Sequence, residues 1–136
     1  MDIWKIIYDK ARSVLSPRVI SPFVEAGSVG AAILTKAANI YVGVCIDTAC
    51  TLGMCAERNA IANMITNGEH NIVKLVCVMT DGSVGSPCGA CRELLMQLSK
   101  DSPKIEILTE LDGFKTVTLG ELVPDWWGRE RMDRED

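Results

Sequence analysis

Apolar residues recur along the chain with two periods, one typical of helices and one typical of strands. Residues 2–15 place apolar side chains three and four positions apart and are followed by Pro17, which predicts a helix. Residues 29–35 and 40–46 are apolar runs joined by a polar turn, which predicts two paired strands. Residues 55–68 return to helical spacing, so a second helix is expected there.

The second half of the chain continues the alternation of strand and helix. Residues 72–79 are almost continuously apolar, as expected for a strand that is covered on both faces. Residues 86–100 form the next predicted helix, with Ser86 as its N-cap and Pro87 at its first position. The remaining predicted elements are two strands, residues 104–110 and 114–118, and a short helical turn within residues 119–128.

This order of elements predicts an α/β protein. Two strand–helix–strand units imply right-handed crossovers and some parallel strand pairing. We therefore expect a three-layer α/β/α sandwich around a mixed five-stranded sheet. A chain of 136 residues can bury the core of one domain, so we expect a single domain over residues 1–136, with residues 128–136 as a solvated tail.

Composition and charge narrow the classes of partner. Hydrophobic residues make up 48% of the chain and charged residues 24%, the balance of a globular protein. The net charge of −4 and the lack of clustered Lys and Arg argue against a nucleic-acid partner. Charges interrupt the first 17 residues, unlike a signal peptide, and no apolar run approaches the roughly 20 residues of a membrane span. We expect a cytoplasmic protein with no membrane partner.

Six cysteines are the most informative polar feature of the sequence. In a reducing compartment they are not expected to form a disulfide framework. Cys55 opens one predicted helix, and Cys88 and Cys91 lie one turn apart at the start of another, where the helix dipole favours thiolates. Three thiolates on tetrahedral zinc leave a fourth position open for water. The sequence therefore predicts one Zn²⁺ per chain, with Glu57 able to reach that water.

The combination Cys55-Ala56-Glu57 and Pro87-Cys88-x-x-Cys91 matches the signature of zinc nucleobase deaminases, with Cys in place of His as the first ligand. Through these motifs the chain resembles the cytidine deaminase family in its small three-cysteine form, and the related blasticidin S deaminases. The resemblance covers residues 27–124 and includes the stretches GSVGAAILT, GMCAERNAI and SPCGACRELL. It implies a cytidine deaminase-like fold, a nucleoside-like substrate and a homotetramer.

The function implied by the resemblance is hydrolytic deamination of cytidine or 2′-deoxycytidine to uridine or 2′-deoxyuridine, with release of ammonia, in pyrimidine salvage. Glu57 would carry protons from water to the base. Arg58 would balance the charge of the ligand thiolates, unless it pairs with an exposed carboxylate instead, and Arg92 is a second candidate. The N–H of Ala56 would bind the base carbonyl, and the carbonyl of Ser86 would accept from the leaving amine.

Substrate-contacting positions depart from the family pattern. Cytidine deaminases hold the ribose with Asn-x-Glu on the second strand, where this chain has Cys45-Ile46-Asp47. A modified cytosine nucleoside, or another aminated heterocycle of the blasticidin S type, is therefore the alternative substrate. By the same likeness, Trp127 or its neighbour Trp126 is expected either to reach a neighbouring subunit's pocket or to serve in packing.

Two other classes of protein compete with a deaminase. Cys88 and Cys91 could form a thioredoxin-like dithiol, although thioredoxins carry this pair earlier in the chain and need no upstream Cys-x-Glu. The three cysteines could also belong to a non-catalytic zinc site closed by Cys50 or Cys77 as a fourth ligand. Otherwise Cys77 is expected in the core, Cys50 in packing, and His70 exposed without a role.

Overall fold

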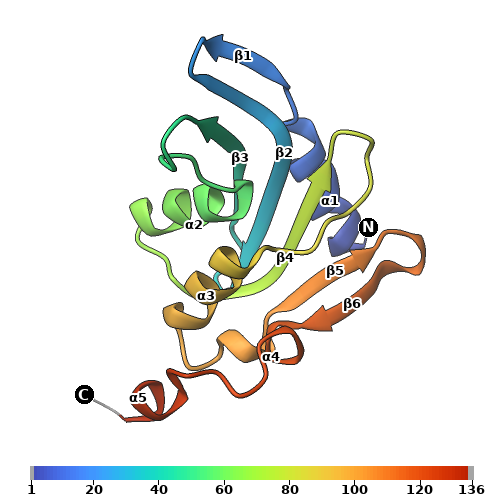
Figure 1. Cartoon of the computed structure of the whole chain (residues 1–136). Coiled ribbons are helices and arrows are strands. Elements are labelled where there is room, and N and C mark those ends of the chain that lie inside the picture. Colours follow the sequence, from blue (N-terminus) through green and yellow to red (C-terminus); the bar gives the residue numbers. More distant parts are fainter. Residues whose placement is uncertain (1, 135–136) are drawn as a thin grey trace.

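The computed structural model describes residues 2–134, which contain five α-helices and six strands (Figure 1). The helices are α1 (Ile3–Ser13), α2 (Ala56–Thr66), α3 (Gly89–Leu98), α4 (Leu119–Leu122) and α5 (Arg129–Asp133). The strands are β1 (Arg18–Ser21), β2 (Val24–Thr35), β3 (Ile40–Thr48), β4 (Ile72–Met79), β5 (Glu106–Glu110) and β6 (Lys115–Thr118). No helix within these residues is long and apolar enough to cross a membrane.

The long strand β2 organises one mixed sheet. One edge of β2 pairs antiparallel with β3. Its other edge pairs first with β1, around residues 24–26, and then with β4, over residues 29–35. β4 pairs parallel with β5, which pairs antiparallel with β6. The antiparallel β3 and β4 thus flank β2, and their ends lie beside the helices that follow them.

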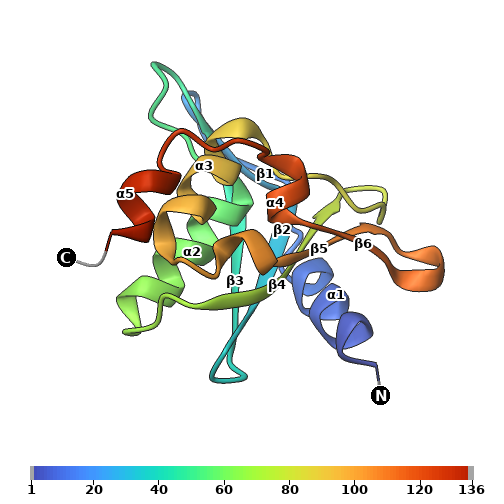
Figure 2. The same cartoon turned by 90° about the horizontal axis from the view of Figure 1, so that it is seen from below.

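Helices cover both faces of this sheet, as expected for a three-layer sandwich (Figure 2). On β2, Ala31 and Ile33 belong to the core cluster under α2 and α3, whereas Ala32 belongs to the cluster under α1. On β4, Leu75 and Val76 divide between the same two clusters. Successive strand residues point to opposite faces, so two covered faces require the continuous apolar runs seen in the sequence.

The α/β class and the sandwich are confirmed, but the sheet has six strands rather than the expected five. The additional strand is β1, whose side chains are almost all exposed, including Val19 and Ile20. A short edge strand with no buried face has no apolar alternation, so its sequence between Pro17 and Pro22 resembled a loop.

Helix boundaries differ from the prediction where the site lies. Strand β4 spans the predicted residues 72–79, but α3 begins at Gly89 with Cys88 as its N-cap. The prediction of Ser86 as N-cap was therefore wrong. Ser86 and Pro87 lie before the helix. Arg92 holds both of them: its Nη2 donates to Ser86 Oγ at 3.1 Å, and its Nε donates to the carbonyl oxygen of Pro87 at 2.7 Å.

The C-terminal segment contains structure that the pattern did not indicate. Residues Arg129–Asp133 form α5, and Met132 packs against the core beside the buried Trp126. The other side chains of α5 are exposed. Of the predicted tail 128–136, residues 135–136 lie outside the described residues, and the extent of the domain stays a prediction.

Candidate metal centre and active site

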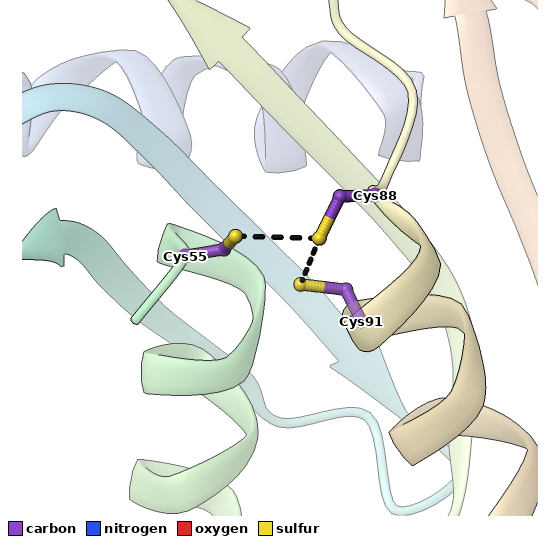
Figure 3. A group of neighbouring side chains, drawn as sticks. All are labelled: Cys55, Cys88 and Cys91. Atoms are coloured by element: carbon purple, nitrogen blue, oxygen red, sulfur yellow. Dashed lines mark hydrogen bonds between the residues drawn. The ribbon is translucent and has the colours of Figure 1, made fainter. Parts of the chain in front are cut away.

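Two helix N-termini meet at the three cysteines of the sequence motif (Figure 3). Cys55 is the N-cap of α2, Cys88 is the N-cap of α3, and Cys91 lies in the first turn of α3. Neither N-cap sulfur forms the usual side-chain hydrogen bond to its own helix. Both sulfurs are therefore free to bind another group, close to the positive ends of two helix dipoles.

The position of α2 depends on close contact with β3. A Cβ atom on Gly43 would lie 2.4 Å from the backbone nitrogen of Ala60, so only glycine allows this approach. Asn59 strengthens the contact, because its Nδ2 donates to the carbonyl oxygen of Val44 at 3.1 Å. Together these contacts hold the start of α2, with Cys55, beside the end of β3.

The spacing of the thiols fits one zinc ion. The Sγ–Sγ distances are 3.4 Å between Cys55 and Cys88 and 3.6 Å between Cys88 and Cys91, and all three atoms lie within 4.8 Å of one another. Zn–S bonds of about 2.3 Å in a tetrahedron separate sulfurs by about 3.8 Å. Within residues 2–134 no fourth ligand joins the cluster, so the closed site with Cys50 or Cys77 is not supported. The three-ligand set is that of a catalytic zinc centre.

The surroundings of Cys88 and Cys91 shift the pKa values of their thiols in different directions. Burial opposes ionisation of Cys88, but hydrogen bonds from the backbone N–H of Cys91 and the Cys55 side chain lower its pKa overall. Burial raises the pKa of Cys91, and the negative charge of Glu57 adds to this effect. The pKa values of Cys88 and Cys91 thus shift in opposite directions, and a bound cation would favour the thiolate form of both.

Arg58 supplies a cation beside the cluster. Its Nη2 donates to the Cys55 sulfur at 3.8 Å, and this bond raises the pKa of the guanidinium, although burial acts in the opposite direction. Among the described residues Arg58 forms no ion pair with a carboxylate, so the alternative of an exposed partner is not found. The second candidate, Arg92, instead holds the segment before α3.

A cavity of about 340 Å³ opens beside the thiols. Glu57, which is only 4% exposed, is one of its lining residues. The predicted substrate-contacting residues Cys45, Asp47, Ala56 and Ser86 also line it. The structure therefore brings four of the five residues predicted to contact the substrate into one cavity with Cys55 and Cys88. Its volume lies within the range of small-molecule sites, about 300–1,000 Å³.

Trp127, the fifth predicted residue, does not line this cavity. It is 73% exposed, and its Nε1 donates to Glu93 at 3.0 Å. Trp126 is buried and donates to the same carboxylate at 3.1 Å. Trp126 thus serves in packing, while Trp127 presents its ring to the surface.

Two further cavity residues with a hydroxyl or thiol group were missed by sequence reasoning. Cys77 was interpreted as a core residue; it is buried, but it also lines the cavity beside Glu57. Burial and the charge of Glu57 raise its pKa, so this thiol stays neutral. Its position two residues after Leu75 on β4 was a usable signal, since alternate strand residues share a face. Ser28 had no such signal; its Oγ lies 3.3 Å from the Cys45 sulfur.

The remaining polar candidates lie away from the cavity. His70 is exposed, as expected. Cys50 is also exposed, so its expected role in packing was wrong. Its backbone and that of Thr51 are left-handed, with φ of 63° and 64°, in a surface loop where side chains turn outward.

Comparisons with known proteins agree with this site. A family model described as the cytidine and deoxycytidylate deaminase zinc-binding region matches residues 21–105. The cytidine deaminase of Sporosarcina psychrophila is 32% identical over 135 residues, covering 97% of this chain and 96% of that protein. The blasticidin-S deaminase of Bacillus cereus is 36% identical over 106 residues, or 71% and 74% of the two chains.

Solved structures extend the likeness to the whole fold. A crystal structure of a mutant cytidine deaminase from Mycobacterium tuberculosis matches with a TM-score of 0.79 and 26% identity, covering 96% of this chain and 99% of that chain. This fold and the third thiol at 3.4 Å from Cys88 leave no support for a thioredoxin-like dithiol. With three thiols that fit one zinc ion and a matching family model across most of its length, the chain belongs to the cytidine and deoxycytidylate deaminase zinc-binding family.

Proposed function

We propose that this protein deaminates cytidine and 2′-deoxycytidine hydrolytically, giving uridine or 2′-deoxyuridine and ammonia. The observation that carries the proposal is a cluster of three zinc-compatible thiols, two of which, Cys55 and Cys88, line one nucleoside-sized cavity together with the buried Glu57. The likeness to curated cytidine deaminases over nearly the whole chain supports the same activity.

The reaction adds water to the ring carbon that carries the amine and breaks the carbon–nitrogen bond. Zinc held by Cys55, Cys88 and Cys91 would supply a coordination position in which water becomes nucleophilic near neutral pH. Glu57 accepts a proton from the water and transfers it to the neighbouring ring nitrogen. It then takes the proton of the hydroxyl group added to the ring carbon and delivers it to the departing amine. The carbon–nitrogen bond breaks, the ring carbon becomes a carbonyl and ammonia leaves, so one buried carboxylate serves as base and acid.

Other residues of the cavity hold the base and balance charge. The N–H of Ala56, at the start of α2, would donate to the base carbonyl, and the carbonyl of Ser86 would accept from the amine; both residues line the cavity. Arg58 offsets part of the negative charge that three thiolates bring to the centre. Cys45 and Asp47 line the part of the cavity assigned to the sugar.

Cys45 and Asp47 suggest a second candidate substrate. The Cys45 thiol contacts Asp47 Oδ2 at 3.9 Å and Ser28 Oγ at 3.3 Å. Part of its hydrogen-bonding capacity is therefore already used within the protein. A thiol is also a weaker donor and acceptor than an amide. A modified cytosine nucleoside, or an aminated heterocycle such as that of the blasticidin-S deaminase of Bacillus cereus, is the alternative substrate.

The decisive variant is Glu57→Gln. We expect the variant to retain one zinc per chain, measured by atomic absorption, and to lose at least about 100-fold in kcat, measured as ammonia release, because proton transfer contributes about 10²–10⁴ to such rates. Glu110→Gln, which neutralises an exposed carboxylate paired with Lys115, is the control and should keep full activity. Full activity of the Glu57 variant would refute the assigned role.

The substrate is identified by a panel of cytidine, 2′-deoxycytidine, cytosine, N4-substituted cytidines and blasticidin S. Turnover of the two nucleosides supports the main proposal. If both fail while another compound of the panel is deaminated, the alternative substrate replaces them.

We also propose a cytoplasmic homotetramer. All six cysteines are free thiols, and zinc binding requires three of them to stay reduced, which favours a reducing compartment. Large apolar side chains at the surface, such as Phe23, Leu52 and Trp127, favour association with further copies of the chain. Light scattering after size exclusion should give four times the chain mass, and a monomer mass would overturn this assembly.

A further inference from the structure

A buried thiol outside the zinc cluster faces the active-site cavity. Cys77 on β4 is 4% exposed and lines this cavity together with Glu57. It pairs with Ala31 on β2, and Ala31 belongs to the core cluster under α2 and α3. Directly paired residues of neighbouring strands point to the same face of a sheet. The strand β4 therefore presents the Cys77 side chain to the face that carries Glu57.

The Cys77 side chain forms a hydrogen bond with the Glu57 carboxylate. Burial, followed by the charge of Glu57 and this hydrogen bond, raises the pKa of Cys77, so the sulfur keeps its proton. An ionised carboxylate offers acceptors only, whereas a protonated thiol offers one weak donor. The S–H group of Cys77 is therefore the donor, and an oxygen of Glu57 is the acceptor.

The loop that follows β4 fixes the position of Cys77. The N–H of Gly85 donates to the carbonyl oxygen of Cys77 at 2.8 Å, and Val78 pairs with Val84 in an antiparallel bridge. A Cβ atom on Gly85 would lie 3.9 Å from Cys77 Sγ, in ordinary van der Waals contact. Pairing with β2 on one side and with this loop on the other thus holds the donor in place.

The task assigned to Glu57 explains why such a partner matters. The carboxylate must accept a proton and release it again, although the side chain is buried and has little water around it. Burial of a charged group without a hydrogen-bond partner is costly. A cationic partner would hold the carboxylate in its charged form. A weak neutral donor instead fixes one oxygen and leaves the other free to bind and release the proton.

We propose that Cys77 is a positioning residue for the deamination: its S–H group holds one oxygen of Glu57, so that the other oxygen faces the thiol cluster and carries the proton. The proposal rests on the proposed function, because Glu57 is the proton carrier only in that reaction. It deepens the function by adding a residue that acts through Glu57 rather than on the substrate.

Two substitutions separate the donor from the volume of the side chain. Cys77→Val removes the donor at similar size, whereas Cys77→Ser keeps a donor. With the zinc-loaded protein and the best substrate of the cytosine panel, we expect Cys77→Val to lower kcat about fivefold, the size of one lost hydrogen bond, and to change KM by less than about twofold. Cys77→Ser should recover most of the loss. The control Cys50→Ser, at an exposed cysteine that does not line the cavity, should keep full activity.

A double-mutant cycle with Glu57→Gln shows whether Cys77 acts through Glu57. If it does, adding Cys77→Val to Glu57→Gln should change the residual rate by less than about twofold, because the partner of the thiol is already lost. A thiol that only fills space would cost the same factor in both backgrounds.

The S–H stretching band gives a measurement that needs no turnover. In infrared difference spectra of the zinc-loaded protein, the band that disappears in Cys77→Val belongs to Cys77. A charged acceptor makes a stronger hydrogen bond than a neutral one and weakens the S–H bond more. The band should consequently move to higher wavenumber in Glu57→Gln. It should stay in place in Glu110→Gln, which removes an equal charge from an exposed residue paired with Lys115.

Four results would overturn the proposal. They are wild-type kcat in Cys77→Val, no recovery in Cys77→Ser, an equal loss in both backgrounds of the cycle, and an S–H band that Glu57→Gln leaves in place. If no compound of the panel releases ammonia, the proposed function itself fails. The band then decides the contact alone: a shifted band supports the hydrogen bond between Cys77 and Glu57, and an unchanged band refutes it.

Discussion

At the scale of single residues, Arg58 offsets the negative charge of the three ligand thiolates. Three thiolates on Zn²⁺ leave a net charge of −1, which makes bound water less acidic than at a neutral centre. Arg58 lies against the Cys55 sulfur at 3.8 Å and supplies the compensating positive charge. Its Nε is buried and has no hydrogen-bond partner among residues 2–134, so the guanidinium keeps its place through Nη2 and packing.

Replacing Arg58 with Ala should therefore lower zinc affinity or kcat by about 10–100-fold, the usual cost of removing a partner of a metal ligand. A competition titration with a chromogenic chelator and steady-state kinetics measure the two effects. Arg58→Lys keeps the charge but not the planar group, and we expect it to recover part of the loss. Wild-type affinity and rate in Arg58→Ala would show that the contact has no role in charge balance.

Among the secondary-structure elements, the decisive contact is that of α2 with β3. The helix lies on the strand at Gly43, and its first residue follows Cys55 and immediately precedes Glu57. A displacement of α2 by the width of a methyl group would move Cys55, the proposed zinc ligand, and Glu57, the proposed proton carrier, together. We therefore expect activity to depend on a glycine that does not line the cavity.

We expect Gly43→Ala to destabilise the protein by about 1–3 kcal/mol, because the added methyl group would overlap backbone atoms of α2 that cannot rotate away. The loss of activity should exceed the loss of folded protein. Urea unfolding and kinetics below the transition measure both quantities. Gly89→Ala is the matched control, since no atom lies within 4 Å of its Cβ position; an equal effect of the two substitutions would disprove the steric argument.

For the whole molecule, the thiol cluster joins two helices that approach each other mainly at their N-termini. α2 is held by β3, whereas the segment before α3 is held by Arg92. A zinc ion bound by sulfurs from both helices links these parts of the fold. Metal binding should consequently contribute to the free energy of unfolding as well as to the reaction.

Removal of zinc should lower the Tm of the whole protein. Free zinc at about a thousand times its Kd stabilises a folded state by about 4 kcal/mol, and this contribution disappears with a chelator. Differential scanning calorimetry with and without chelator measures the change, and added zinc should reverse it. Cys88→Ser should show a smaller response, because one of three ligands is lost; a chelator effect as large as in the wild type would exclude Cys88 as a ligand.

Much of this fold follows from local patterns. The run 72–79 is β4 to the residue, and the other long strands and helices overlap the predicted ranges, although β2 begins at Val24 rather than at residue 29. The short β1 was missed because a strand without a buried face shows no alternation of apolar and polar residues. The start of α3 was misplaced because the N-cap signal of Ser86 is weaker than the contacts of Arg92, which keep this segment extended.

By itself, the sequence predicted three thiols as zinc ligands, Glu57 as the proton carrier, and the family. These predictions were possible because helix N-termini and residue spacing are local properties. Only the tertiary structure decided which residues line the cavity beside the thiols. Cys77 and Ser28 enter the cavity through strand pairing. Such contacts join residues far apart in the chain, and they depend on packing and register, which no local pattern encodes.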